Sequence, residues 1–377
     1  MSYLNFILIW ILVLILKYSN ETQPSVVFLT MASAAIVLFF KFRNFKILQL
    51  NEVTVWRSLL IGLIAIHLTY AASHLRHPPT NDVGVTTIAA GTLLEHGWNP
   101  YTHAVDTGAA KLLDGTRYAE DRNFSGFKYG PIMAIAYVPL SVILGDRSLV
   151  ITNFILMCAV LTLVYRLAAG EQVGGSVFGY RAACLCASLP IIIFQLYSKG
   201  TTDVVPTALL LLGFVMYSRY HFATGVCLGL SISAKIFPAL VVAPLLLPKE
   251  GRWEYIGGLL VGLFPLLAFT VKSPVLVVDN LIWFNELRQM DATSWLYHDP
   301  KWVITCVRAA FIGLWFSAIG WVLFRPVRLH RLMTVACMLI IGLILTGPGI
   351  HENYAVWWLP LFAAIVCARP PVPTLPP

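Results

Sequence analysis

The sequence predicts an all-α fold, a polytopic transmembrane bundle of about 11 to 13 helices. Hydrophobic residues make up 58% of the 377 residues and charged residues only 12%, and the mean hydropathy is +0.77. Soluble globular domains carry about twice that share of charge. The apolar runs are roughly 15 to 24 residues long, and a helix of about 20 residues crosses a hydrocarbon core ~30 Å thick. Lipid is therefore the solvent for most of the chain.

The basic residues indicate how the helices are oriented. The chain has 26 Lys and Arg against 18 Asp and Glu, a formal charge of +8. Most of the basic residues fall in short loops between apolar runs, and such loops lie on the cytoplasmic side of a membrane. We therefore expect membrane lipid, and no nucleic acid, as a partner of this charge.

The pattern divides the chain into three parts. Residues 1–54 hold two N-terminal helices, 3–17 and 25–42, and a cytoplasmic loop. Residues 55–368 hold the main transmembrane domain. Residues 369–377 form a Pro-rich tail that we expect to be irregular and cytoplasmic.

The main domain begins with a helix at 55–73, which leads into a long external loop, 74–128. The next apolar run, 129–145, contains two prolines, so it is either a full crossing or a half-inserted helix that returns to the same face. The basic loops favour the return. The further predicted helices are 148–167, 180–197, 204–219, 253–271, 301–324, 330–347 and 354–368.

Lys235 lies in the middle of an apolar run, where an unpaired charge is costly. The run is best interpreted as two short helices that meet in an outer turn at Lys235-Ile-Phe-Pro238. A second long external loop, 272–300, follows the next crossing. Because long loops often carry function, we expect the chemistry at the outer ends of the helices.

The first external loop contains the stretch TNDVGVTTIAAGTLLEHGWNPYTH. Its apolar positions recur at helical spacing and a glycine follows them: Val85, Ile88, Ala89, Leu93 and then Gly97. This pattern predicts a short amphipathic helix on the membrane surface. Asp82, at its start, is then a helix N-cap, a catalytic carboxylate or a plain loop acid. Trp98 and Tyr101, further along, fit an aromatic belt at the membrane interface.

Several motifs in this order resemble the C-type glycosyltransferases. They are the acid at Asp82, the short helix, GWNPY, FKYGP, GLSISAKIFPAL and HENY. Within that superfamily they are similar to glycosyltransferase family 87, the polyprenol-phosphate-mannose-dependent mannosyltransferases, over roughly residues 56–368.

The resemblance implies transfer of a hexosyl residue, by analogy mannosyl, from a polyprenyl-phosphate sugar donor to a hydroxyl of a lipid-linked or glycan acceptor. It implies an integral protein of a bacterial plasma membrane that builds a cell-envelope glycan on the extracytoplasmic face. By motif position, Asp82 is the general base. We expect no cofactor and no metal.

Inverting transfer needs a base for the acceptor hydroxyl and cations for the departing phosphate. Lys235 is the strongest phosphate candidate, unless its ammonium snorkels to lipid headgroups. Arg308, about two turns inside a helix, either pairs with an acid such as Asp203 or binds phosphate. His351 and Glu352 begin a helix, and His351 binds phosphate or a sugar hydroxyl, or is structural.

Two more pairs are substrate-binding candidates. Lys199 and Asp203 flank an external turn, where Asp203 holds sugar hydroxyls, serves as an alternative base, or only caps a helix or forms a local ion pair. Lys128 and Tyr129 meet the donor or the acceptor, although Tyr129 fits an interface anchor equally well.

Two other functions use the same features. A membrane transporter or flippase for a lipid or small solute also has intramembrane charges and proline-broken helices. A polymerase or ligase of polyprenyl-linked glycans also has large external loops. Transporters commonly show internal repeats, and the short hairpin at Lys235 has no counterpart in the other half of the chain.

Overall fold

The computed structural model describes residues 51–79, 81–102, 127–170, 175–283, 293–325 and 327–368. The two predicted N-terminal helices and the C-terminal tail lie outside the described residues. Every element in the described ranges is helical, which confirms the all-α fold class. Five helices are long and apolar enough to cross a membrane, or six if one bent pair forms a single span.

The five long helices match predicted crossings, with ends only a few residues from those expected. They are α3 (Glu52–His74), α8 (Arg147–Ala169), α14 (Arg252–Lys272), α17 (Lys301–Phe324) and α18 (Leu329–Thr346). The bent pair consists of α9 (Gly175–Ala187) and the segment Pro190–Ser198, which holds α10 (Pro190–Ile193) and η2 (Phe194–Ser198). The two parts meet at 58°, beside Pro190, whose missing N–H cannot continue the helical ladder.

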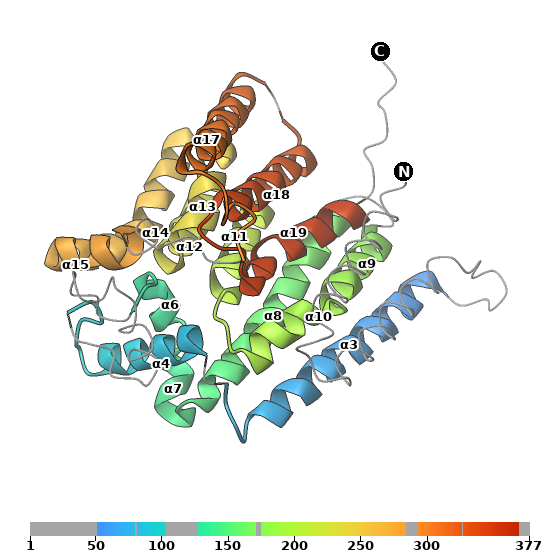
Figure 1. The fold of residues 1–377 in the computed structure, drawn as a ribbon. Coiled ribbons are helices and arrows are strands. Elements are labelled where there is room, and N and C mark those ends of the chain that lie inside the picture. The colour runs from blue at the N-terminus through green and yellow to red at the C-terminus, as the bar shows by residue number, and fades with distance from the viewer. Residues whose placement is uncertain are drawn as a thin grey trace, which may run out of the picture.

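Shorter helices complete the bundle. They are α11 (Val204–Met216), α12 (His221–Ala234), α13 (Ile236–Val242), η3 (Ala243–Leu246), α15 (Pro274–Val278), η4 (Asp279–Trp283), η5 (Glu352–Tyr354) and α19 (Ala355–Cys367). In Figure 1, α3 and α9 lie side by side at one edge, and α17 and α18 stand on the far side of α11 and α12.

The described helices alternate between two ends of the bundle. At one end, Lys235 at the end of α12 contacts Asp203 at the start of α11, and Tyr70 near the end of α3 lies 3.1 Å from Ser198. We call this the Asp203 end. At the opposite end, Arg181 of α9 pairs with Glu52 at the start of α3. This alternation agrees with the predicted order of crossings.

The chain reverses direction at Lys235, as the sequence predicts. Lys235 is extended, with φ −151° and ψ 116°, between α12 and α13. The hydroxyl of Tyr255 donates to the Ala243 carbonyl oxygen at 2.7 Å, while the Tyr255 carbonyl oxygen packs on Gly225. The end of α13 therefore lies near the start of α12, so the two helices form a hairpin with Lys235 at its tip.

Glycines bring α12 and α14 unusually close together. Gly225 and Gly229 of α12 face Gly258 and Gly262 of α14, each pair spaced four residues apart. A Cβ on Gly229 would lie 2.4 Å from the Leu259 carbonyl oxygen, so only glycine fits. Small residues at this spacing allow transmembrane backbones to touch, and this glycine seam fixes the hairpin against α14.

The segment between Tyr129 and Gly145 returns to the end at which it starts. It forms two short helices, α6 (Pro131–Ile135) and α7 (Val138–Leu144). Before α6, the Gly130 amide donates to the Ala234 carbonyl oxygen at 2.9 Å. After α7, Leu149 of α8 contacts Gly84 and Gly200. Both ends of the segment thus lie at the Asp203 end, which favours the half-inserted interpretation over a full crossing.

The predicted loop helix is present as α4 (Asp82–Glu95), followed by Gly97 with φ +74°. It packs against α6 and α7 at the Asp203 end (Figure 1). The expected apolar face was wrong in part: only Ile88 of the four apolar positions is fully buried. The buried residues are mostly small, Gly84, Thr86, Thr87, Ala90 and Gly91, because α4 packs closely on protein backbone.

Candidate functional site

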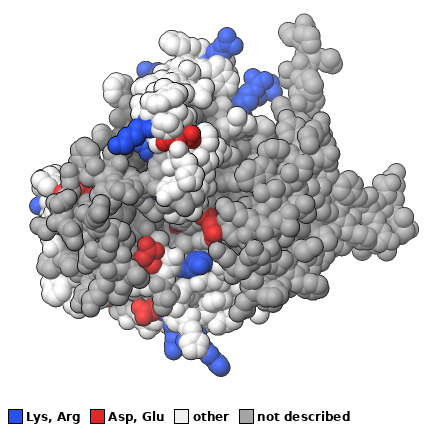
Figure 2. All heavy atoms as spheres, viewed as in Figure 1, with Lys and Arg blue, Asp and Glu red and all other residues white. Residues whose placement is uncertain are grey.

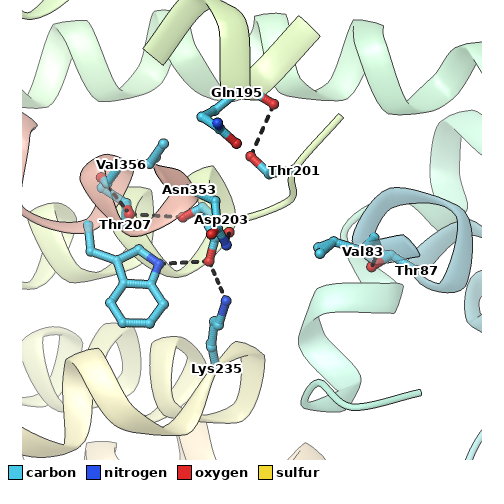
Figure 3. Close-up of polar contacts among 10 residues, drawn as sticks. Val83, Thr87, Gln195, Thr201, Asp203, Thr207, Lys235, Asn353 and Val356 are labelled. Atoms are coloured by element: carbon cyan, nitrogen blue, oxygen red, sulfur yellow. Dashed lines mark hydrogen bonds and ion pairs between the residues drawn. The ribbon is translucent and has the colours of Figure 1, made fainter. Parts of the chain in front are cut away.

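Asp203 is the centre of a buried polar cluster at the Asp203 end. It is fully buried in the turn before α11, and both carboxylate oxygens accept hydrogen bonds. One oxygen, Oδ1, receives Lys235 Nζ at 2.5 Å and Trp357 Nε1 at 2.7 Å. The other, Oδ2, receives Asn353 Nδ2 at 2.7 Å. Figure 3 shows Lys235 and Asn353 converging on Asp203 from separate elements.

Aromatic rings surround the Lys235 ammonium. Its Nζ lies 4.7 Å from the ring centre of Trp357, 5.1 Å from Tyr129 and 5.4 Å from Tyr354. Rings at these distances attract a cation through their negative faces. The Lys235 side chain is only 13% exposed. The snorkelling interpretation was therefore wrong, because the ammonium points into the bundle toward a fully buried acid.

Neighbouring hydroxyls hold the elements that carry this cluster. The Thr207 hydroxyl donates to the Asp203 carbonyl oxygen at 2.8 Å and lies 3.1 Å from the Val356 carbonyl oxygen, which ties α11 to α19 (Figure 3). The Ser231 hydroxyl donates to the Pro206 carbonyl oxygen at 2.8 Å, which ties α11 to α12. The positions of Asp203 and Lys235 are thus set by buried main-chain contacts.

Three contacts expected of Asp203 were wrong. Asp203 occupies the N-cap position of α11, but its side chain makes no cap hydrogen bond. Its ion-pair partner is Lys235 and not the adjacent Lys199, which is exposed and lies 5.3 Å from the ring centre of Phe194. Arg308 is not among the partners of the Asp203 carboxylate, which are Lys235, Asn353 and Trp357. The Arg308 Nε donates to the Thr346 carbonyl oxygen at 3.3 Å.

Asp82 is exposed in the first turn of α4. The N-cap position of this helix is held by Asn81, whose Oδ1 accepts from the Val83 amide at 2.9 Å. Asp82 Oδ1 accepts from the same amide at 2.8 Å, so the Asp82 carboxylate also contacts the first turn of its own helix, as the capping interpretation expects, but from the residue after the N-cap position. Two residues on, Gly84 touches Gly200, which precedes Asp203 by three positions. This contact ties the start of α4 to the turn that carries Asp203, and Figure 3 shows Val83 and Thr87 of α4 across from the cluster.

His351 and Glu352 lie beside the cluster, in the same short segment as Asn353. The buried Gln195 donates its side-chain N–H to Glu352 Oε2 at 2.9 Å. The His351 ring packs edge-on against Tyr354, with 5.4 Å between ring centres. The structure therefore brings the predicted residues of this segment next to Asp203 and Lys235.

The side chains of Lys128 and Tyr129, in the segment before α6, contact different parts of the protein. Lys128 is buried and donates to Asn280 Oδ1 at 2.9 Å, whereas the ring of Tyr129 faces Lys235. The Tyr129 carbonyl oxygen accepts from the hydroxyl of Tyr101 at 2.6 Å. Tyr101 is buried, so its assignment to an interface belt was wrong, while Trp98 is 53% exposed.

Sequence reasoning missed the residues that complete the cluster: Gln195, Asn280, Asn353 and Trp357. A signal existed for two of them, since Asn353 and Trp357 follow His351 and are four positions apart, the spacing of one helix face. Gln195 and Asn280 had no such signal. Within the described ranges, no group of three His, Cys, Asp or Glu side chains is placed to hold a metal ion.

Among the described residues on the face seen in Figure 2, a few charged side chains lie near its centre and others at its margins. A pocket of about 320 Å³ lies elsewhere, at the end of the bundle opposite Asp203. Its lining includes Tyr217 after α11, His221 at the start of α12 and Arg325 after α17. It is therefore separate from the cluster.

Comparison with protein families gives a match over a large part of the chain. The model of glycosyltransferase family 87 matches residues 127–348, which include the segments of Lys128, Asp203, Lys235 and Arg308. Asp82 and His351 lie outside the matched range. Comparison with curated proteins gives no match. Because the family match covers more than half of the chain, the protein is a glycosyltransferase and belongs to glycosyltransferase family 87.

Proposed function

We propose that this protein transfers a hexosyl residue, by family resemblance mannosyl, from a polyprenyl-phosphate sugar to a hydroxyl of a lipid-linked or glycan acceptor. The transfer inverts the anomeric centre and takes place on the extracytoplasmic face of a bacterial plasma membrane. One observation carries the proposal: Asp82, an exposed carboxylate in the first turn of α4, is fixed through Gly84 and Gly200 to the end of the bundle that holds Asp203 and Lys235.

In this mechanism Asp82 is the general base. Its carboxylate removes the proton from the acceptor hydroxyl as the hydroxyl oxygen bonds to the anomeric carbon of the donor. The bond from that carbon to the phosphate oxygen breaks, and polyprenyl phosphate leaves with the electron pair. A positioned base contributes about 10²- to 10⁴-fold to such a step.

The leaving phosphate requires cations, and several lie at the Asp203 end. Lys199 is exposed next to Gly200, and Arg308 reaches the last turn of α18. We propose that these two and His351 bind the phosphate, and that Lys128, Tyr129 and Glu352 contact the sugar or the acceptor. Asp203 and Lys235 already hold each other, which favours a different role for that pair.

The test uses membranes that contain the full chain, supplied with radiolabelled polyprenyl-phosphate mannose. Asp82→Asn is expected to lower transfer at least about 100-fold. Asp146→Asn is the matched control, because Asp146 is also an exposed acid at a helix start. Asn81→Ala removes one of the two side-chain acceptors of the Val83 amide, which costs stability of at most about 2 kcal/mol, but leaves the base. Transfer by Asp82→Asn at the wild-type rate would rule out Asp82 as the base.

The donor and the stereochemistry are tested separately. A nucleotide sugar supplied in place of the polyprenyl-phosphate sugar is expected to give no product. The anomeric configuration of the isolated product, measured by NMR, is expected to be opposite to that of the donor. A product with retained configuration would contradict direct attack by a hydroxyl that Asp82 activates.

A further inference from the structure

We propose that Asp203 and Lys235 form a positioning pair, which holds the segment 351–357 and Tyr129 in place around the substrates and does not itself bind the donor phosphate. The inference rests on the proposed function only in taking the Asp203 end as the site of transfer. It assigns these two charged residues a role that motif position alone does not give.

The charges of the pair already compensate each other. Lys235 Nζ lies 2.5 Å from Asp203 Oδ1, and three aromatic rings surround the ammonium. One N–H donor of the ammonium goes to Asp203, and a phosphate that drew Lys235 away from this contact would replace Asp203 as its partner. That replacement would leave a fully buried carboxylate without its cation, and removing one partner of a buried ion pair is strongly unfavourable.

The pair joins four segments that are distant in the sequence. Asp203 begins α11, and Lys235 is the tip of the α12–α13 hairpin. Asn353 and Trp357 bring in the segment with His351 and Glu352 through hydrogen bonds of 2.7 Å to the same carboxylate. The fourth segment is held by Gly130, whose amide donates to the Ala234 carbonyl oxygen next to Lys235.

These contacts hold in place neighbouring residues that we propose contact the substrates, although the pair itself does not touch the substrates. His351 and Glu352 precede Asn353 directly, so the orientation of Asn353 sets theirs. Tyr129 follows Lys128 and packs over the Lys235 ammonium. Loss of the pair would therefore shift both proposed substrate-binding segments together, without removing any group that touches substrate.

The first experiment is a double-mutant cycle on the full chain in nanodiscs, with kcat and the KM for polyprenyl-phosphate sugar measured for each variant. Asp203→Asn and Lys235→Met are each expected to lower kcat about tenfold or more. The double variant is expected to be no worse than either single variant, because the residues act as one unit.

The sign of the Asp203→Asn effect separates the two roles of Lys235. If Lys235 binds the donor phosphate, freeing it from Asp203 strengthens donor binding, so Asp203→Asn lowers the KM and Lys235→Met raises it. Such opposite changes would overturn the proposal. For a positioning pair, both single variants change kcat and KM in the same direction.

Amide hydrogen exchange provides a readout that requires no donor and covers the possibility that a variant is inactive for another reason. In purified protein, Asp203→Asn is expected to increase exchange at 351–357 and 127–131 more than within α8. The milder variant Asn353→Ala, which leaves the ion pair intact, is expected to increase exchange at 351–357 alone. A uniform increase, or none, would overturn the positioning role. If the donor proves to be a different sugar carrier, the exchange pattern still decides the role of the pair.

Discussion

The indole N–H of Trp357 donates to the Asp203 carboxylate at 2.7 Å, although the two residues lie 154 positions apart in the sequence. This contact connects the first turn of α19 to the start of α11 in the interior of the bundle. Hydrogen bonds to charged groups are stronger than those between neutral groups. Loss of this contact should therefore lower the free energy of unfolding by a measurable amount.

Replacing Trp357 with Phe keeps a ring near Lys235 but removes the N–H donor to Asp203. We expect this variant to lower the free energy of unfolding by about 1 to 3 kcal/mol, because a buried carboxylate oxygen loses a partner. The measurement is thermal unfolding in detergent. Trp358→Phe, at the adjacent position, is the control. Equal losses in the two variants would mean that the Trp357 indole contributes only through packing.

Gly130→Ala is expected to disturb the junction between the segment of Lys128 and the tip of the α12–α13 hairpin. A Cβ at this position would lie 1.9 Å from the Ser233 carbonyl oxygen, so one segment must move. Overpacking of this kind costs about 1 to 3 kcal/mol, and transfer activity should fall with it. Gly62→Ala, in a helix position with no atom within 4 Å, should be neutral or stabilising by up to ~1 kcal/mol. Similar unfolding of both variants would contradict the close contact.

Gly84→Ala tests the fixed position of α4. Its Cβ would meet the Gly200 carbonyl oxygen at 2.5 Å and Leu149 at 2.6 Å, which displaces the turn that begins with Asp82. Catalysis is sensitive to small displacements of a positioned group, so we expect activity to fall about tenfold or more. Gly91→Ala, in the same helix, meets nothing closer than 3.6 Å and should keep its activity. Full activity in Gly84→Ala would show that the start of α4 need not touch Gly200.

Tyr101→Phe removes the hydrogen bond to the Tyr129 carbonyl oxygen and is expected to cost about 1 kcal/mol. Burial raises the pKa of the Tyr101 phenol well above its ordinary value, whereas in the unfolded chain the phenol ionises near pH ~10. The raised folded pKa means that the stabilisation is complete below pH ~10 and is lost as the pH rises above it. Unfolding of wild type and variant across this range should therefore differ by a constant amount below pH ~10 and by less above it. A constant difference throughout would contradict the raised pKa.

The helices of the main domain could be predicted from the sequence because their signals are local. Apolar length and basic loops set the crossings, and the lysine within an apolar run predicts the hairpin at Lys235. The side-chain partners could not be predicted in the same way. Asp203 has equally plausible neighbours in Lys199, Arg308 and Lys235, and the choice depends on how α11, α12 and α19 pack in three dimensions.

The buried face of α4 was mispredicted for a physical reason. Helical periodicity identifies large apolar residues, such as Val85 and Leu93, as the face that packs. Here the closest approach is made by Gly84 and Gly91, because small residues allow backbone contact with Gly200 and α6. Periodicity in hydrophobicity does not detect packing of this kind.

The glycine seam between α12 and α14 affects how variants of this protein should be interpreted. Gly229 and Gly262 leave no space between the two backbones. A shift of α12 at this contact would therefore be transmitted along the helix to Lys235, which follows its last residue. A bulkier residue at Gly262 would tilt α12 and displace the ammonium, although the atoms nearest to the added side chain belong to the α12 backbone. In a mutational scan, inactive variants along this lipid-embedded seam would resemble active-site losses, and only a measurement of side-chain placement at the tip would tell them apart.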